Sequence, residues 1–230
     1  MKAFFFDIFG TLVDWRSSII KGIKKLDKFK YGDIEAFVIY WRKEYQPILN
    51  KVNNNTLKWQ TLDLLHYITL EKVCKKMNVP KITEKEKKYL VKLWHQLDPW
   101  DDSVEGINLL NKKYITASLS NGNIILQKNL FKYAQLNLDF IFSAEHFKKY
   151  KPHKKVYLGA VKLLNLKVDE CALVASHKSD LLAASKLGLK TIFIERKNEY
   201  GKYKRQSDDT KFNPDIKIRS LTDLTKKLSH

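Results

Sequence analysis

The sequence predicts an α/β protein, with a Rossmann-like parallel sheet core and an inserted helical cap. Three observations indicate this class. The chain opens on a short apolar run, and the next roughly 80 residues carry a helical pattern. From Trp100 onward, short apolar segments alternate with amphipathic ones. Such alternation implies right-handed crossovers and parallel strands, so the first strand belongs with the C-terminal half. We therefore expect a core of residues 1–13 and 99–230 and a cap of residues 14–98.

The first strand is predicted over Ala3–Asp7, a buried run that ends at the turn Gly10-Thr11. Helices are predicted next, with Asp33 as an N-cap and with Thr83 and Glu86 as a capping box. Apolar residues at helical spacing support them: Ile34, Phe37, Val38, Trp41, Tyr45 and Ile48, then Leu62, Leu65, His66 and Thr69, then Tyr89, Leu90, Leu93, Trp94 and Leu97.

The C-terminal half is predicted to supply the rest of the sheet. Asp98-Pro99-Trp100 marks the expected return of the chain from the cap to the core. The strands expected after it are Ile115–Ser120, Phe140–Ser143, Ala172–Ala175, Thr191–Ile194 and Ile216–Ile218. The helices between them carry the apolar positions Ile124, Leu126, Leu130, Val156, Ala160, Val161, Leu164, Leu181, Leu182 and Ala184.

The composition is typical of a folded, cytoplasmic protein. A hydrophobic fraction of 44% with five tryptophans can fill a core. No apolar run approaches the roughly 20 residues that span a bilayer, and the N-terminal run is too short for a signal peptide. Cys74 and Cys171 match no metal or redox spacing, so reduced thiols are expected. No membrane partner is predicted.

The net charge of +18 raises the question of nucleic-acid binding. The lysines, however, are spread over the whole chain, and no nucleic-acid motif accompanies them. We interpret them as a solvated surface and expect no nucleic-acid partner. Positive charge would still steer small anionic substrates toward the protein.

Polar side chains follow four of the predicted strands. Asp7 ends the first strand, Ser120-Asn121 the second and Ser176-His177 with Asp180 the fourth, while Lys151 follows the third. Ligands of open parallel sheets bind beyond the carboxyl ends of the strands. We therefore expect these groups to converge on one crevice.

Four segments in this order resemble the motifs of the haloacid dehalogenase superfamily. They are Phe6-Asp7-Ile8-Phe9-Gly10-Thr11-Leu12-Val13-Asp14-Trp15-Arg16, Leu119-Ser120-Asn121-Gly122, Tyr150-Lys151-Pro152 and Val174-Ala175-Ser176-His177-Lys178-Ser179-Asp180. The resemblance covers nearly the whole chain and is most like type II (L-2-haloacid) dehalogenases. Phe9 decides the branch, because phosphatases of the superfamily carry a second aspartate there, which acts as an acid and base, and phenylalanine has no titratable proton. Trp41-Arg42 and Tyr157 match the same branch.

The resemblance implies a hydrolase that converts short 2-haloalkanoic acids, small anionic substrates, to 2-hydroxy acids. Asp7 would attack the carbon that carries the halogen and form an ester. Lys151 would keep Asp7 ionised, and Arg42 would neutralise the developing anion. The remaining roles are orientation of Asp7 by Thr11 and Ser120, substrate or halide binding by Ser120, Asn121 and Tyr157, activation of water by Asp180, Ser176 and His177, and an apolar wall of Phe9 and Trp59.

The last motif departs from the family pattern. Typical members resemble Ser-Asn-Ala-Trp-Asp, whereas this chain has His177 in place of the asparagine and Ser179 in place of the tryptophan. His177 stays open between a ligand and a base for water. No metal or other cofactor is expected, although Mg²⁺ would serve a phosphatase.

Two alternatives and one assembly state remain open. A Mg²⁺-dependent phosphatase acting on a small phosphorylated metabolite would share the fold. A non-catalytic protein would instead bind polyanions through the positive surface, and its salt-sensitive binding would persist in Asp7→Asn. Relatives in this family are commonly dimers, so the resemblance also leaves a homodimer open.

Overall fold

The computed structural model describes residues 1–29, 33–203 and 211–228. Six parallel strands form the main sheet in the order β5-β4-β1-β6-β7-β8. Their bounds are Ala3–Phe6 (β1), Ile115–Ser120 (β4), Phe140–Ser143 (β5), Cys171–Ala175 (β6), Lys190–Ile194 (β7) and Ile216–Ile218 (β8). The predicted α/β class with a parallel sheet is confirmed.

Strand β1 lies in the middle of the sheet because all four of its side chains are apolar and buried. Its last residue, Phe6, pairs with Ser118 of β4 and Val174 of β6. Phe4 and Phe6 contribute to one hydrophobic cluster, and Ala3 and Phe5 to another, because successive side chains of a strand point to opposite faces. The sheet therefore has a buried core on each face.

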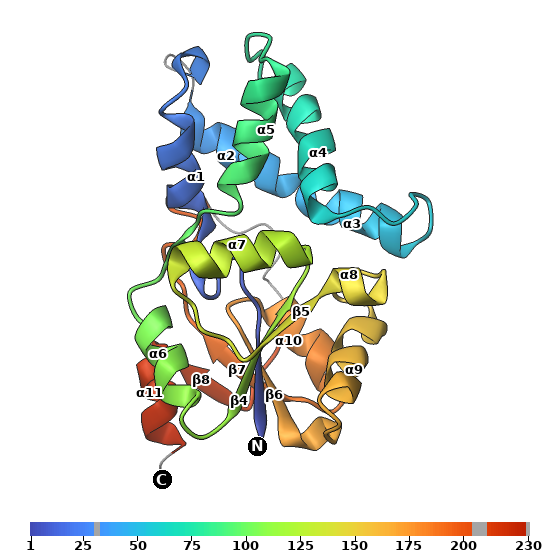
Figure 1. Cartoon of the computed structure of the whole chain (residues 1–230), viewed down its shortest axis with the longest axis vertical. Coiled ribbons are helices and arrows are strands. Elements are labelled where there is room, and N and C mark those ends of the chain that lie inside the picture. Colours follow the sequence, from blue (N-terminus) through green and yellow to red (C-terminus); the bar gives the residue numbers. More distant parts are fainter. Residues whose placement is uncertain (30–32, 204–210, 229–230) are drawn as a thin grey trace.

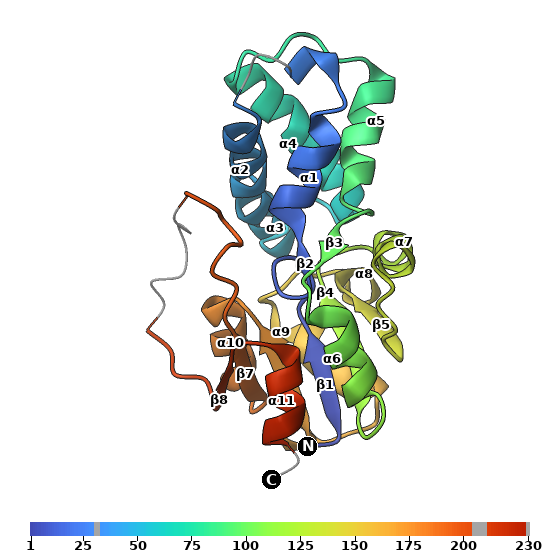
Figure 2. The same cartoon turned by 90° about the vertical axis from the view of Figure 1, so that its left-hand side faces the viewer.

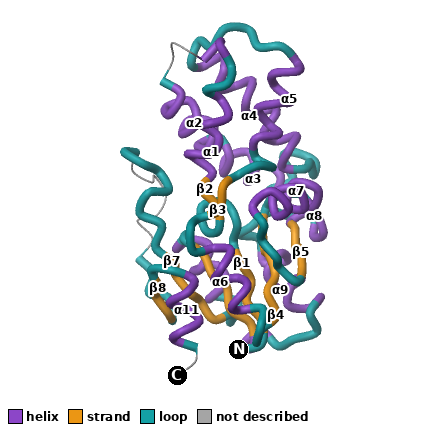
Figure 3. Tube along the Cα trace, turned by 60° about the vertical axis from the view of Figure 1, so that its left-hand side comes forward, coloured by secondary structure: helices purple, strands orange, loops and turns teal. Residues whose placement is uncertain are grey.

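Helices cover both faces of the sheet. Side chains from α6 (Ser103–Leu110), α7 (Ile124–Ala134) and α11 (Leu221–Lys227) pack into the cluster on the Phe4 side. Those of α9 (Lys154–Leu163) and α10 (Lys178–Ser185) pack into the cluster on the Phe5 side. Two short elements, α8 (Ala144–Phe147) and the 3₁₀ turn η2 (Val168–Glu170), complete this described part. The result is a three-layer α/β/α core (Figures 1 and 3).

A group of helices lies beyond the carboxyl ends of the strands (Figure 1). It consists of α1 (Trp15–Ile23), η1 (Asp27–Phe29), α2 (Ile34–Lys43), α3 (Tyr45–Asn53), α4 (Leu62–Lys76) and α5 (Glu84–Leu93). The predicted caps are confirmed: Asp33 accepts a hydrogen bond from the Ala36 N–H, and Thr83 with Glu86 forms a capping box. Buried residues of this part, such as Trp41 and Trp94, belong to the same cluster as Phe4 and Phe6.

Two very short strands lie where the chain passes between the two parts. β2 (Val13–Asp14) and β3 (Asp98–Pro99) pair in antiparallel fashion, with Val13 opposite Pro99 and Asp14 opposite Asp98. Figure 2 shows this pair between the helices and the sheet. It holds both passages side by side, so the helical part is fixed directly above the strand ends.

Candidate active site

Asp7 follows β1 directly and starts the turn that leads to the helical part. Its N–H donates to the Val174 carbonyl oxygen at 3.0 Å, which continues the pairing with β6. The turn then closes through the Thr11 N–H, which donates to the Ile8 carbonyl oxygen. Gly10 has φ +86°, a value that glycine adopts without steric cost. The turn thus presents Asp7, whose side chain is only 10% exposed, at the edge of the sheet.

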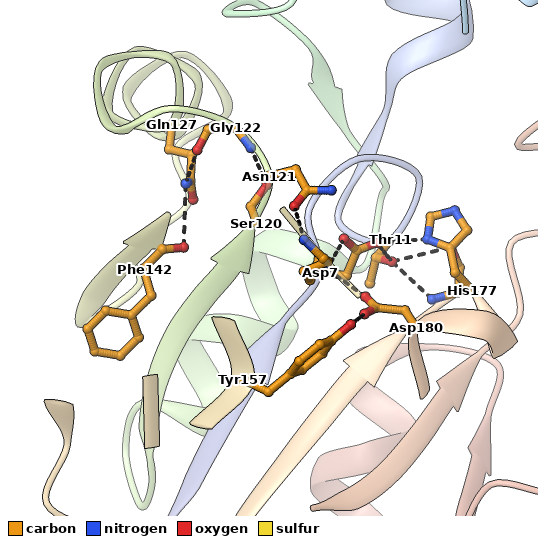
Figure 4. A network of polar contacts seen from close by, with 12 residues as sticks. Asp7, Thr11, Ser120, Asn121, Gly122, Gln127, Phe142, Tyr157, His177 and Asp180 are labelled. Carbon is orange, nitrogen blue, oxygen red and sulfur yellow. Dashed lines mark hydrogen bonds and ion pairs between the residues drawn. The ribbon is translucent and has the colours of Figure 1, made fainter. Parts of the chain in front are cut away.

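Three side chains bind the Asp7 carboxylate. Lys151 Nζ lies 2.8 Å from Oδ1, and the Thr11 hydroxyl donates to Oδ2 at 2.8 Å. His177 Nδ1 lies 2.8 Å from Oδ2 (Figure 4). Thr11 is itself fixed, because the Ser176 N–H donates to its hydroxyl oxygen at 2.9 Å. These contacts fix the orientation of the Asp7 carboxylate, a group that can act as a nucleophile.

Lys151 bridges two carboxylates. Its Nζ lies 2.5 Å from Asp180 Oδ2, and its backbone N–H donates to Asn121 Oδ1 at 2.8 Å. Burial alone would lower the pKa of Lys151, but the charges of Asp180 and Asp7 outweigh it and raise this pKa above its usual value. Lys151 therefore stays protonated and is not a base at neutral pH.

Both oxygens of Asp180 are engaged. Oδ2 pairs with Lys151, and Oδ1 accepts a hydrogen bond of 2.5 Å from the Tyr157 hydroxyl (Figure 4). Burial raises the pKa of Asp180, against the opposing effect of the Lys151 charge. Asp180 is thus a second acidic group beside Lys151, and the hydroxyl of Tyr157 in α9 fixes its orientation.

His177 connects Asp7 to a residue that the sequence analysis missed, Glu199. The Nε2 atom of His177 lies 3.1 Å from Glu199 Oε1, which also accepts a hydrogen bond from the Trp15 indole at 3.0 Å. Burial raises the pKa of Glu199 to about 7. The missed signal was its position shortly after β7, whose carboxyl end faces the same crevice as the other strand ends.

Arg42 reaches the site from α2 in the helical part. Its guanidinium lies 4.1 Å from the centre of the Tyr45 ring and 5.4 Å from that of Trp15. Nη1 is buried and has no hydrogen-bond partner among the described residues. A buried cationic donor without a partner is costly, and an anionic ligand would satisfy it.

These groups surround a cavity of about 540 Å³ between the helical part and the sheet. Among its lining residues are Asp7, Phe9, Arg42, Asn121, Lys151, His177 and Asp180. Phe9 packs edge-on against Trp94, with ring centres 5.8 Å apart. The Asn121 amide donates to the Tyr45 hydroxyl at 2.9 Å, so the core and the helical part share the cavity wall. The volume is more than sufficient for a small acid.

Other residues singled out in the sequence lie outside the described cavity lining. Thr11 and Ser176 lie behind Asp7, and Tyr157 lies behind Asp180. Ser120 accepts a hydrogen bond from the Gly122 N–H and so shapes the turn that presents Asn121 (Figure 4). Trp59 stacks on Tyr150 with ring centres 4.6 Å apart, at the contact between the two parts.

Two general features of the described chain bear on its chemistry. Within residues 1–29, 33–203 and 211–228, no three His, Cys, Asp or Glu side chains gather in a way that could hold a metal ion. Over the same ranges, no helix has the length and apolar character needed to cross a membrane.

Comparisons with known proteins show which family this chain is similar to. A family model of haloacid dehalogenase-like hydrolases matches residues 1–188. The (S)-2-haloacid dehalogenase 4A of Burkholderia cepacia is 27% identical over 211 residues, which cover 88% of this chain and 87% of that protein. The crystal structure of an L-2-haloacid dehalogenase is 39% identical, with a TM-score of 0.93 over 99% of both chains. That of a defluorinating L-2-haloacid dehalogenase is 34% identical, with a TM-score of 0.93 over 100% of this chain and 96% of the other.

Proposed function

The chain belongs to the haloacid dehalogenase-like hydrolases, and we propose that this hydrolase of carbon–halogen bonds acts on short 2-haloalkanoic acids through an ester on Asp7. One observation carries the proposal. The Asp7 carboxylate lines the cavity and is held between Lys151, Thr11 and His177, and Phe9 stands two residues later instead of an acid. Halide leaves without protonation, so displacement needs no acid at that position.

The first step is a displacement at carbon. An Asp7 oxygen forms a bond to the carbon that carries the halogen, and the carbon–halogen bond breaks with release of halide. The buried guanidinium of Arg42 would bind the substrate carboxylate or stabilise the negative charge that develops on the leaving halogen. Phe9 and Asn121 would supply the apolar and polar parts of the cavity wall. Inversion at the carbon is the expected stereochemical outcome.

The second step is hydrolysis of the ester. Water attacks the carboxyl carbon of Asp7, and the 2-hydroxy acid leaves with an Asp7 oxygen. Lys151 and Thr11 remain beside the ester and would polarise its carbonyl group. Of the groups expected from the sequence to activate this water, His177 and Asp180 line the cavity, and Ser176 lies behind Asp7.

The residues present do not suit Mg²⁺, the metal of the related phosphatases. The Phe9 side chain offers no oxygen ligand, and the ammonium group of Lys151 lies between the Asp7 and Asp180 carboxylates. The remaining Asp180 oxygen accepts a hydrogen bond from Tyr157. A hard divalent cation needs several free oxygen ligands. We therefore expect dehalogenation to persist in a chelator.

The test is halide release from each enantiomer of 2-chloropropionate, with and without EDTA. We expect chloride from one enantiomer, no effect of EDTA, and no turnover in Asp7→Asn, because an amide is not a nucleophile at neutral pH. Asp169→Asn is the matched control, since Asp169 is an exposed carboxylate at the opposite end of the sheet. No chloride from either enantiomer, together with Mg²⁺-dependent release of phosphate from a phosphate ester, would establish the phosphatase instead.

A further inference from the structure

Glu199 is a buried carboxyl group to which the displacement step assigns no role. It lies in the segment after β7 and is 2% exposed. Its Oε1 atom is close to both the Trp15 indole N–H and His177 Nε2, and the Ser176 hydroxyl lies 3.5 Å from its Oε2. The backbone carbonyl oxygen of Glu199 accepts a hydrogen bond from Arg16. Glu199 is therefore fixed by both the helical part and the core.

The turn after Asp7 is shaped around this carboxyl group. A Cβ atom at Gly10 would lie 2.1 Å from Glu199 Oε1, closer than two such atoms can approach. Glycine at position 10 therefore leaves room for the Glu199 carboxyl group and also permits the positive φ of the turn. Any side chain at position 10 would require the Glu199 carboxyl group to shift away from the nucleophile turn.

The protons of the His177 ring are limited by its two neighbours. Nδ1 faces Asp7 and Nε2 faces Glu199, yet a neutral imidazole carries one N–H. Before the reaction the ionised Asp7 binds the Nδ1–H, so Nε2 can accept a hydrogen bond from a protonated Glu199. A pKa of about 7 for Glu199 is consistent with that state.

We propose that Glu199 is a positioning residue that makes His177 the general base for hydrolysis of the Asp7 ester, an inference that rests on the proposed function. Ester formation removes the negative charge of Asp7, which otherwise opposes ionisation of Glu199. Glu199 then ionises and binds an N–H on Nε2, which leaves the Nδ1 lone pair directed at the ester. The proton lost at this stage goes to solvent along with the halide.

The hydrolytic step then balances. Nδ1 takes a proton from water as the water oxygen bonds to the Asp7 carboxyl carbon. The bond from that carbon to the ester oxygen breaks, and the leaving alkoxide takes the proton from Nδ1. The new Asp7 acid returns its proton to Nδ1 while the Nε2 proton passes to Glu199, which restores the starting state. Over the whole cycle, haloacid and water yield hydroxy acid, halide and one proton.

The neighbouring groups are less suited to this role. Lys151 is protonated, because its two carboxylate partners raise its pKa. Asp180 has both oxygens engaged, one by Lys151 and one by the Tyr157 hydroxyl. His177 is the group whose ring nitrogen lies 2.8 Å from the carboxylate that becomes the ester and whose far side meets a carboxyl group. This is the arrangement that orients and activates a histidine base.

The test separates the two half-reactions in Glu199→Gln. An amide cannot exchange the proton with Nε2, so we expect one equivalent of halide to be released at close to the wild-type rate. The ester, detected by the mass of the intact protein after acid quench, should then decay about 100-fold more slowly, the scale of a lost general base. Glu195→Gln is the matched control, an exposed glutamate of the same segment. It should match the wild type in both phases.

A pH profile distinguishes this role from a structural one. In the wild type, ester decay should rise with pH as the His177–Glu199 pair loses a proton, and in Glu199→Gln this dependence should be absent. Other charged groups that act on Glu199 include Asp7, which opposes its ionisation, and Arg42 and Arg196, which favour it. Equal slowing of both phases without ester accumulation, or decay at the wild-type rate, would overturn the inference.

A second variant guards against loss of folding. Trp15→Phe keeps an aromatic side chain but removes the N–H that stabilises the ionised Glu199. It should slow ester decay several-fold and leave the halide burst unchanged, and unchanged decay would count against the inference. If the wild type forms no ester, the proposed function itself fails, and the role of Glu199 fails with it.

Discussion

Lys151 is the residue on which the charge balance of the site depends, because it pairs with Asp7 and Asp180 at 2.8 and 2.5 Å. In Lys151→Met the two buried carboxylates would face each other without a counter-charge, so one of them would hold a proton at neutral pH. We expect the rate of ester formation at pH 7 to fall by at least about 100-fold and to recover partly as the pH rises. Single-turnover halide release between pH 5 and 9 measures this effect.

Lys155→Met is the control for loss of one positive charge, since Lys155 is exposed at the start of α9. It should leave the profile unchanged. A pH-independent loss in Lys151→Met would mean that Lys151 contacts the substrate instead of maintaining the charge of Asp7.

The sequence could identify the site residues that lie next to strand ends in a fixed order. Asp7, Asn121, Lys151, His177 and Asp180 were found in this way, and the structure brings all of them to one cavity. Glu199 escaped because a single glutamate in an irregular segment carries no pattern, and its role depends on a contact with His177 across 22 residues. Trp59 was singled out for its apolar character. That character does not distinguish a side chain in the cavity wall from one that stacks on Tyr150, as Trp59 does.

At the scale of elements, the turn from β1 to β2 tests the close approach of Glu199. Gly10→Ala would place a methyl group 2.1 Å from Glu199 Oε1 and would also force alanine to φ +86°. Gly188→Ala is a matched control, because its φ is +93° while a Cβ there would meet Val168 at 3.5 Å. We expect Gly188→Ala to lower the free energy of unfolding by about 1 kcal/mol. Gly10→Ala should lower it by clearly more, as measured by urea unfolding, and equal losses would show that Glu199 moves aside freely.

The strands of the main sheet were predictable because each is a short segment of apolar or alternating residues between segments of helical pattern. β4, β5 and β8 have the predicted bounds, β6 and β7 begin one residue earlier, and β1 ends at Phe6 so that Asp7 lies outside it. The β2–β3 pair was not predicted, since two residues per strand carry no periodicity and Pro99 disfavours a strand. The pairing forms only because the folded helices bring both passages together.

At the scale of the whole molecule, the helical part and the sheet share one hydrophobic cluster. Residues as distant as Trp41 and Val174 belong to it, so neither part buries its apolar surface without the other. We therefore expect a single cooperative unfolding transition. All five tryptophans lie between residues 15 and 100, so their fluorescence reports mainly on the helical part, whereas far-UV circular dichroism reports on the whole chain. The two midpoints should coincide, and an earlier fluorescence transition would reveal independent unfolding of the helices.

The pairing of β2 with β3 also has an evolutionary consequence. The helical part leaves the core at Val13–Asp14 and returns at Asp98–Pro99, two points that are hydrogen-bonded neighbours (Figure 2). A segment whose ends meet can be lengthened, shortened or exchanged for another without displacing the strands below it. The nucleophile and its charge partners could then be inherited unchanged while the helical part over them diverged. New substrates could be acquired by replacing the helical part, with no need to evolve the covalent chemistry again.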